Sequence, residues 1–173
     1  LGEIILTEQD IWKYITQLAI VINEFHNDIK CNNIMIYSNN AYLIDLGIMT
    51  EGESSCDGTD NYMPYNKIKC ARQIPARRAN PSYPCNSDIC PKQHDIYALA
   101  IIMIYFIYYT EMWGKYYLID ILSHSHAVHR RHSGENRNDH IKRVLRLDKN
   151  YNVSDEYKEF IIDIIDEKNK CCR

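Results

Sequence analysis

The stretch that decides the fold is HNDIKCNNIMIYSNNAYLIDLG, which runs from His26 to Gly47. It holds two short β-forming runs, 34–37 and 42–44, separated by the Ser-Asn-Asn triplet at 38–40. Short β-forming runs on either side of such a turn predict a tight antiparallel hairpin. Charged and amide side chains cluster just before and just after this hairpin, which makes the stretch the first place to look for chemistry.

Apolar residues recur at helical spacing elsewhere in the chain. The first helix is predicted to begin at Thr7, which can cap it with Asp10 in the first turn, and to run straight into His26. Its apolar positions are Ile11, Ile15, Leu18, Ile22 and Phe25. The segment 95–110 is almost wholly apolar and is expected to form a helix that is buried on all sides.

Ser154 is expected to cap a last helix at 154–165. The residues predicted for one face of that helix are Tyr157, Phe160, Ile161, Ile164 and Ile165. The segment 45–93 holds most of the Gly, Pro, Ser and Cys residues and is expected to be a long loop region. A short amphipathic piece is expected at 116–122, and the polar stretch 123–140 is interpreted as a solvated connection.

The composition is that of a globular chain with one core. With 173 residues the chain is too short for two ordinary domains, and 46% hydrophobic residues argue against disorder. A formal net charge of -3 gives no reason to expect nucleic acid or an anionic membrane as a partner. The 7 Cys residues are odd in number and irregularly spaced, which favours the reducing cytosol or nucleus over a disulfide framework.

The residues around the predicted hairpin suit phosphoryl transfer. This chemistry needs a carboxylate to orient the attacking hydroxyl, a cation near the transferred phosphate and oxygen ligands for Mg²⁺. Such groups occur in the run His26-Asn27-Asp28-Ile29-Lys30-Cys31-Asn32-Asn33 and, after the hairpin, in Asp45-Leu46-Gly47. This order resembles the H-R-D-x-K-x-x-N catalytic loop and the D-F-G metal-binding loop of protein kinases.

The resemblance implies a role for each of these residues. Asp28 would orient the hydroxyl and accept its proton, and Lys30 would offset the charge that builds on the γ-phosphate. Asn33 and Asp45 would bind Mg²⁺. Together with Lys30 and Met35, these two residues would also contact bound ATP. A Lys two residues after the catalytic Asp is the form usual in kinases that act on Ser or Thr.

Two later segments resemble the same family. The run Gly58-Thr59-Asp60-Asn61-Tyr62-Met63-Pro64 is similar to the end of an activation segment, G-T-x-x-Y-M-A-P-E. Thr59 in that place would hydrogen-bond near Asp28 and Lys30 and help to shape the acceptor site. The run 95–100 resembles the D-x-W-S-L-G start of the central helix, so Asp95 would hold the catalytic-loop backbone, besides capping its own helix.

The resemblance covers nearly the whole chain and implies one kinase-like C-terminal (large) lobe over 1–173, mainly α with a small β-hairpin. Its parts would be the catalytic and Mg²⁺ loops at 26–47, an activation segment at 48–66, an inserted loop at 67–94, a central helix at 95–110 and a penultimate helix at 154–165. No Gly-rich loop and no strand Lys precede Asp28. The lobe that covers ATP is therefore expected to be absent from this chain, which alone should bind ATP poorly.

The chain departs from the family pattern at three places, of which the mildest is Leu46 in place of the Phe of D-F-G. The Arg of H-R-D is Asn27, so phosphorylation of the activation loop is not expected to be the switch. The Glu of A-P-E is replaced in the run Pro64-Tyr65-Asn66.

Two other functions stay open. The chain could be an inactive single-lobe kinase mimic that binds and inhibits a host kinase, which the missing upstream motifs favour and the retained Asp28 and Asp45 disfavour. It could also transfer phosphate to a small molecule, against which the peptide-positioning resemblance of 58–63 argues.

The expected partners are a protein substrate or another kinase, with no nucleic acid and no membrane. The H-N-D-I-K variant and a composition rich in Ile, Asn and Tyr resemble kinases of large insect DNA viruses. The expected compartment is accordingly the cytoplasm or nucleus, of the cell or of an infected host cell.

Overall fold

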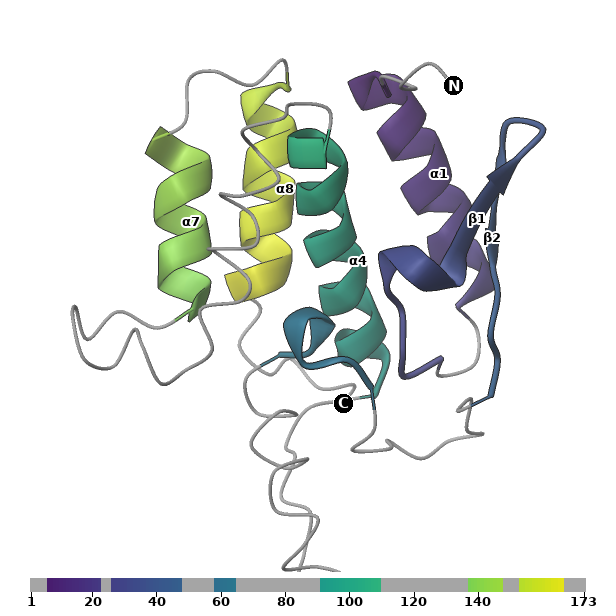
Figure 1. The fold of residues 1–173 in the computed structure, drawn as a ribbon. Coiled ribbons are helices and arrows are strands. Elements are labelled where there is room, and N and C mark those ends of the chain that lie inside the picture. The colour runs from purple at the N-terminus through teal and green to yellow at the C-terminus, as the bar shows by residue number, and fades with distance from the viewer. Residues whose placement is uncertain are drawn as a thin grey trace, which may run out of the picture. The chain divides into compact units, whose positions relative to one another are not determined.

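A computed structural model describes residues 6–22, 26–47, 58–64, 91–109, 137–147 and 153–166 (Figure 1). These ranges contain the α-helices α1 (Glu8–Val21), α4 (Pro91–Tyr109), α7 (Arg137–Leu147) and α8 (Asp155–Asp166) and an antiparallel hairpin of β1 (Ile34–Tyr37) and β2 (Asn40–Leu43). Single 3₁₀ turns lie at Cys31–Asn33 and Asp60–Tyr62. The predicted class, mainly α with a small hairpin, is confirmed. The predicted amphipathic piece at 116–122 and most of the predicted activation segment and inserted loop lie outside the described residues.

The chain separates into two compact units. One contains Leu1–Lys13 and Met103–Asp166, and the other contains Tyr14–Ile102 and Glu167–Arg173. Helices α1 and α4 therefore contribute residues to both units. A single kinase-like domain over 1–173 stays a prediction.

Helix α1 begins where the sequence places it, because its first turn is closed locally. The Asp10 amide donates to Thr7 Oγ1 at 3.2 Å, and the Thr7 amide donates back to Asp10 Oδ2 at 2.9 Å. This reciprocal pair satisfies main-chain donors that a helix start leaves open. Among the predicted apolar positions, Ile11, Ile15 and Leu18 are buried.

The end of α1 differs from the prediction. The helix stops at Val21 and does not run into His26. Its last turn carries Ile20 and Val21, whose side chains are 69% and 58% exposed. Exposed β-branched residues add neither packing nor helix propensity, so nothing sustains the helix through this turn.

The second strand of the hairpin starts two residues earlier and ends one residue earlier than predicted, at Asn40–Leu43. Tyr37 pairs with Asn40, so the turn consists of Ser38 and Asn39 alone. Both turn residues have a positive φ, 47° and 63°. Two successive left-handed residues match the twist of a two-residue hairpin, and Asn tolerates that conformation better than most residues.

Side chains of α1 hold the turn of the hairpin. The hydroxyl of Tyr14 donates to Asn39 Oδ1 at 3.1 Å, and the amide of Gln17 donates to Asn40 Oδ1 at the same distance. Gln17 Oε1 also accepts the main-chain N–H of Ala41 at 2.8 Å. Helix α1 thereby holds the hairpin at its turn. The opposite, open end of the hairpin is joined to the loop that contains Lys30.

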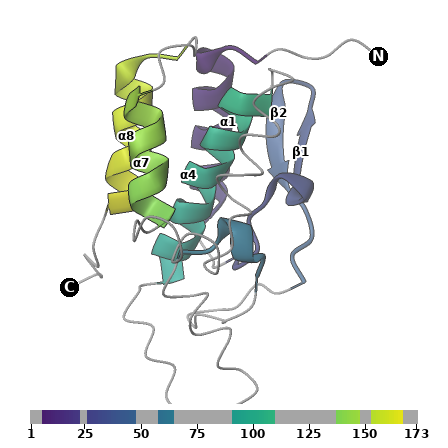
Figure 2. The ribbon, with the colours of Figure 1, turned by 60° about the vertical axis from the view of Figure 1, so that its left-hand side comes forward.

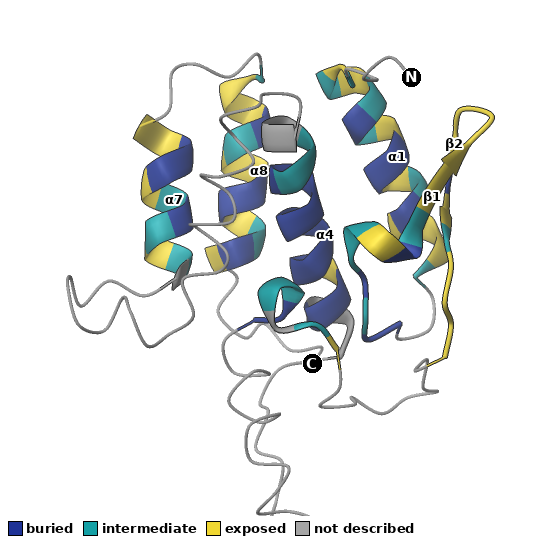
Figure 3. Cartoon of the chain, viewed as in Figure 1, coloured by how far each residue is buried: buried dark blue, intermediate teal, exposed yellow. Residues whose placement is uncertain are grey.

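Helix α4 is longer than predicted. It starts at Pro91, so residues 91–94 belong to the helix and not to the inserted loop. Pro is favoured at the first helical position, where its missing N–H costs nothing. Every residue from Tyr97 to Ile104 is at most 4% exposed, which confirms burial on all sides over these two turns (Figure 3). Ile96, at 39% exposure, is an exception.

Helix α7 is missing from the prediction, which treats 123–140 as a polar connection. Residues 137–140 form its first turn. Its buried apolar residues are only Ile141, Val144 and Leu145, a narrow stripe in a strongly charged helix. These three residues have the i, i+3, i+4 spacing of an amphipathic helix, but the signal covers little more than one turn.

The partner of α7 is α8, which runs antiparallel to it (Figures 1 and 2). Lys142 in the middle of α7 pairs with Asp166 at the end of α8, at 2.5 Å. Arg146 at the end of α7 lies 3.5 Å from Glu159 in the first half of α8. The start of α8 is capped as predicted, because the Tyr157 amide donates to Ser154 Oγ at 3.1 Å.

One face of α8 is corrected by the structure. Tyr157, Ile161 and Ile165 are buried as predicted. Phe160 is 41% exposed, and the buried position is taken by Ile162, which is 1% exposed. Phe160 instead lies against the edge of Trp12, with ring centroids 4.9 Å apart.

Among the described residues, no helix combines the length and apolar character that crossing a membrane requires.

Candidate functional site

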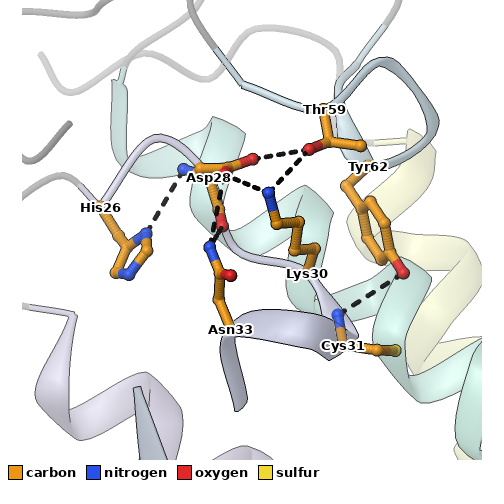
Figure 4. Close-up of polar contacts among 7 residues, drawn as sticks. All are labelled: His26, Asp28, Lys30, Cys31, Asn33, Thr59 and Tyr62. Atoms are coloured by element: carbon orange, nitrogen blue, oxygen red, sulfur yellow. Dashed lines mark hydrogen bonds and ion pairs between the residues drawn. The ribbon is translucent and has the colours of Figure 1, made fainter. Parts of the chain in front are cut away.

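The candidate site lies in the unit Tyr14–Ile102 and is built from three segments. These are the loop 26–33, the short segment 58–64 and the start of α4. Figure 4 shows that Lys30, Asn33 and Thr59 point toward Asp28 from different parts of these segments.

Asp95 in the first turns of α4 holds the loop. Its Oδ2 accepts the main-chain N–H of His26 at 2.8 Å, and its Oδ1 accepts that of Asn27 at 3.0 Å. The Asp95 side chain is 1% exposed. A carboxylate that accepts two backbone N–H groups is stabilised in its charged form. The geometry is the one that the resemblance implies for Asp95, but the prediction that Asp95 also caps its own helix is wrong, because α4 begins four residues earlier at Pro91.

The two residues before Asp28 have defined positions in the loop. Asn27 is 4% exposed and has a φ of 64°, a conformation that Asn adopts at low cost. His26 is 2% exposed, and its Nδ1 lies 3.4 Å from the amide of Asp28 (Figure 4). His26 therefore belongs to the loop and does not end α1.

The carboxylate of Asp28 is the centre of the site. Oδ1 accepts the Thr59 hydroxyl at 2.8 Å. Oδ2 accepts Lys30 Nζ at 2.6 Å and Asn33 Nδ2 at 3.3 Å. Lys30 Nζ also lies 3.3 Å from Thr59 Oγ1, which closes a small ring of contacts. The sequence-predicted residues Asp28, Lys30, Asn33 and Thr59 thus come together.

The charge state of Asp28 follows from this ring. Partial burial works to raise the pKa of its carboxyl, but hydrogen bonds from Lys30 and Thr59, the charge of Lys30 and the Asn33 amide outweigh that effect. The pKa of Asp28 therefore lies below its ordinary value. The group is a carboxylate at neutral pH and can accept a hydrogen bond from an incoming hydroxyl.

Asp45 stands apart from the ring of contacts. It is exposed, and it forms no hydrogen bond or ion pair with another described residue. Its backbone is nevertheless close to Asn33, because the Ile44 amide donates to the Asn33 carbonyl at 2.9 Å and extends the hairpin by one pair. With a φ of 62°, Asp45 turns the chain out of the strand directly after that pair.

Asn33 and Asp45 provide the donor atoms that a hard cation prefers. The Asn33 side chain uses Nδ2 for the carbonyl and carboxylate of Asp28, at 3.0 and 3.3 Å, which leaves its amide oxygen for a ligand. Mg²⁺ is commonly held by one or two protein oxygens plus substrate phosphates and water. The residues present fit such an ion. No group of three His, Cys, Asp or Glu ligands occurs among the described residues.

Met35 lies on an exposed apolar face of the hairpin. Met35, Tyr37, Tyr42 and Ile44 alternate along the two strands, so they share one face, and they are 47%, 68%, 43% and 40% exposed. The opposite face contains Ala41, which is buried. Met35 is therefore on the exposed face of the hairpin, paired with Tyr42.

A small hollow adjoins Asp28 next to the segment 58–64 and the start of α4. It has a cavity volume of about 10 Å³ and lies between the loop, the segment 58–64 and α4, with Thr59, Met63 and Ala98 in its wall. Small-molecule sites usually measure about 300–1,000 Å³. This hollow is therefore too small for a nucleotide.

Two contacts in the site are not evident from the sequence. The hydroxyl of Tyr62 accepts the main-chain N–H of Cys31 at 3.5 Å, which ties the segment 58–64 to the loop (Figure 4). Burial of Cys31 at this contact raises the pKa of its thiol, despite hydrogen bonds that act in the other direction. The anchoring of the hairpin by Tyr14 and Gln17 is likewise invisible in the sequence, since both residues occupy ordinary helical positions.

Comparison with known proteins adds no family. No protein-family model and no curated protein sequence matches this chain.

Proposed function

We propose that this chain is the large lobe of a Ser/Thr protein kinase, which transfers the γ-phosphate of ATP to a Ser or Thr hydroxyl of a protein substrate. One observation carries the proposal. The Asp28 carboxylate is held by Lys30, Thr59 and Asn33 at 2.6, 2.8 and 3.3 Å. The viral source and the cytoplasmic or nuclear location belong to the same proposal.

Asp28 would act on the acceptor hydroxyl. Its lowered pKa makes it a weak base, which suits a reaction whose transition state is loose and whose proton is lost late. The main contribution of Asp28 is then orientation of the hydroxyl, and proton acceptance follows. Thr59 holds Oδ1 of the same carboxylate and so limits the directions from which an acceptor can approach.

Lys30 would stabilise the charge that develops on the transferred phosphate. Its Nζ is 2.6 Å from Asp28 Oδ2, and its side chain is 25% exposed, so the ammonium group lies at the edge of the site. A cation held there by a carboxylate needs little reorganisation when an anionic phosphate arrives.

Asn33 and Asp45 would hold Mg²⁺ through their side-chain oxygens, and Met35 would contact ATP on the exposed hairpin face. The ion would neutralise charge on the phosphates. What the chain itself contributes is the spacing of the two donors, because the Ile44–Asn33 hydrogen bond at 2.9 Å fixes the open end of the hairpin.

The test is Mg²⁺-dependent phosphate transfer to Ser or Thr, measured on the longest polypeptide that the coding sequence around Leu1 allows. Asp28→Asn keeps the shape of the side chain and is expected to lower transfer about 100-fold or more. Asp163→Asn is the matched control, because Asp163 is exposed on α8. Full activity of the Asp28 variant would end the catalytic assignment.

The exposed hairpin face supports a second candidate, an inactive single-lobe mimic that binds and inhibits a host kinase. Four large apolar side chains on one small sheet face, all at least 40% exposed, suit a surface that another protein covers. In that case, the chain should lower the activity of a co-purified kinase even when Asp28 and Asp45 are both replaced by Asn. Tyr37→Ser with Met35→Ser should weaken the inhibition, and inhibition that needs both Asp residues would contradict the mimic.

A further inference from the structure

Gly58 makes the closest approach between the segment 58–64 and the loop 26–33. Its φ is 130°, a conformation that residues with a side chain rarely adopt. A Cβ atom at this position would lie 2.5 Å from the main-chain oxygen of Asn27 and 2.7 Å from Cε of Met63. The Met63 side chain can rotate away, but the Asn27 oxygen belongs to the backbone.

The Asn27 backbone has little freedom to yield. Its N–H is bound by Asp95 at 3.0 Å, and its own φ of 64° already lies in the left-handed region. The chain of contacts therefore runs from α4 through Asp95 to Asn27 and from there to Gly58. The residue after Gly58 is Thr59, whose hydroxyl meets Asp28 at 2.8 Å.

We propose that Gly58 is the positioning residue of this site: its close approach to the Asn27 carbonyl sets the distance between the Thr59 hydroxyl and the Asp28 carboxylate. The catalytic meaning of this distance rests on the proposed kinase function, but the structural relation does not. The hydrogen bond from the Cys31 amide to the Tyr62 hydroxyl, which also joins the two segments, is 3.5 Å long and so lies at the limit of a hydrogen bond.

The size of the effect follows from the contact distances. With Ala at 58, the Cβ to Asn27 oxygen distance must grow from 2.5 Å to beyond 3.0 Å. The shift falls on the segment 58–64, because Asp95 holds Asn27. A displacement of this size at the neighbouring residue would take the Thr59 hydroxyl from 2.8 Å to beyond good hydrogen-bonding distance of Asp28.

The experiment uses the whole 173-residue chain without nucleotide and follows the carboxyl carbon of Asp28 by ¹³C NMR. Thr59→Val removes the hydroxyl and defines the signal of Asp28 without this donor. Gly58→Ala is expected to move the signal to the same position, and the double variant is expected to add nothing further. Gly47→Ala is the matched glycine control, since a Cβ there meets only a side-chain oxygen of Asp45, at 3.2 Å.

A companion variant separates the backbone obstacle from the side-chain obstacle. Gly58→Ala combined with Met63→Ala removes the contact with Cε and is expected not to restore the wild-type signal. Restoration would show that Met63, and not the Asn27 carbonyl, sets the position. A wild-type Asp28 signal in folded Gly58→Ala would overturn the proposal.

Transfer assays on the longer polypeptide separate this inference from the proposed function. If wild-type protein transfers phosphate, Gly58→Ala and Thr59→Val should lower kcat by a similar factor, and the double variant should be no slower than either. Absence of transfer in every protein, with the NMR pattern as expected, would end the kinase proposal and leave the positioning role intact. Multiplied kcat losses in the double variant would show that Gly58 does not act through Thr59.

Discussion

Replacing Asp95 by Asn tests how the loop 26–33 is held. The wild-type carboxylate accepts two main-chain N–H groups, from His26 at 2.8 Å and from Asn27 at 3.0 Å, and is 1% exposed. Asn keeps one acceptor oxygen and replaces the other by an NH₂ group. That group would point a donor at one of the two N–H donors, which leaves a buried amide without a partner.

The expected loss can be estimated from these two bonds. Hydrogen bonds to a charged acceptor are worth about 1.5–3 kcal/mol, and a buried donor left unsatisfied costs about 1–3 kcal/mol. Because one bond survives without its charge and the other is lost, the free energy of unfolding should fall by about 2–4 kcal/mol. With a slope near 2 kcal/mol per M urea, the midpoint should fall by about 1–2 M.

Urea unfolding followed by circular dichroism measures this loss, and hydrogen exchange locates it. The amides of His26 and Asn27 should exchange faster in Asp95→Asn than the loss of global stability alone explains. Asp163→Asn, an exposed carboxylate on α8, should change stability by no more than about 0.5 kcal/mol. A loss in Asp95→Asn no larger than in this control would refute the reasoning.

Three further perturbations test other parts of the fold. Tyr157→Phe removes the hydroxyl that donates to a buried main-chain carbonyl of α4 at 3.1 Å, and should cost about 1–3 kcal/mol in urea unfolding. Burial raises the pKa of the Glu8 carboxyl, but hydrogen bonds from Ser154 and from the Trp12 indole outweigh this effect. The pKa of Glu8 therefore lies below 4.5. The stability that Glu8 contributes is therefore fully present above its pKa in the unfolded state and is lost as pH falls through its pKa in the folded state. Glu8→Gln should remove this part of the pH dependence of the free energy of unfolding. Gln17→Ala should speed exchange of the Ala41 amide, which now donates to Gln17 at 2.8 Å; unchanged exchange would mean that the helix does not hold the hairpin.

Local signals in the sequence were sufficient where the partner lies within one helical turn. The start of α1 is set by Thr7 and Asp10, and the start of α8 by Ser154, so the capping contact lies within four consecutive residues in each case. The burial of α4 could likewise be predicted, because a helix that is apolar on every face is stable only when the protein covers all of its faces. The order Asp28, Lys30, Asn33 also lies within a few residues, so these contacts form over a short loop.

Other features depend on residues distant in the sequence and could not be predicted. The burial of the narrow apolar stripe of α7 depends on its partner helix, and Phe160 lies against the distant Trp12 while Ile162 is buried. The register of the hairpin follows from the left-handed pair Ser38 and Asn39, and α1 holds that turn in place.

The sequence by itself determined which groups the site contains, since the loop 26–33, the residue Asp45 and the segment 58–64 carry them in order. Only the tertiary structure decided their distances. Asp95 fixes the loop through two backbone hydrogen bonds, and Gly58 allows the next segment to approach the Asn27 carbonyl. Both effects act between main-chain atoms of segments distant in sequence, where side-chain identity leaves no periodic pattern to read.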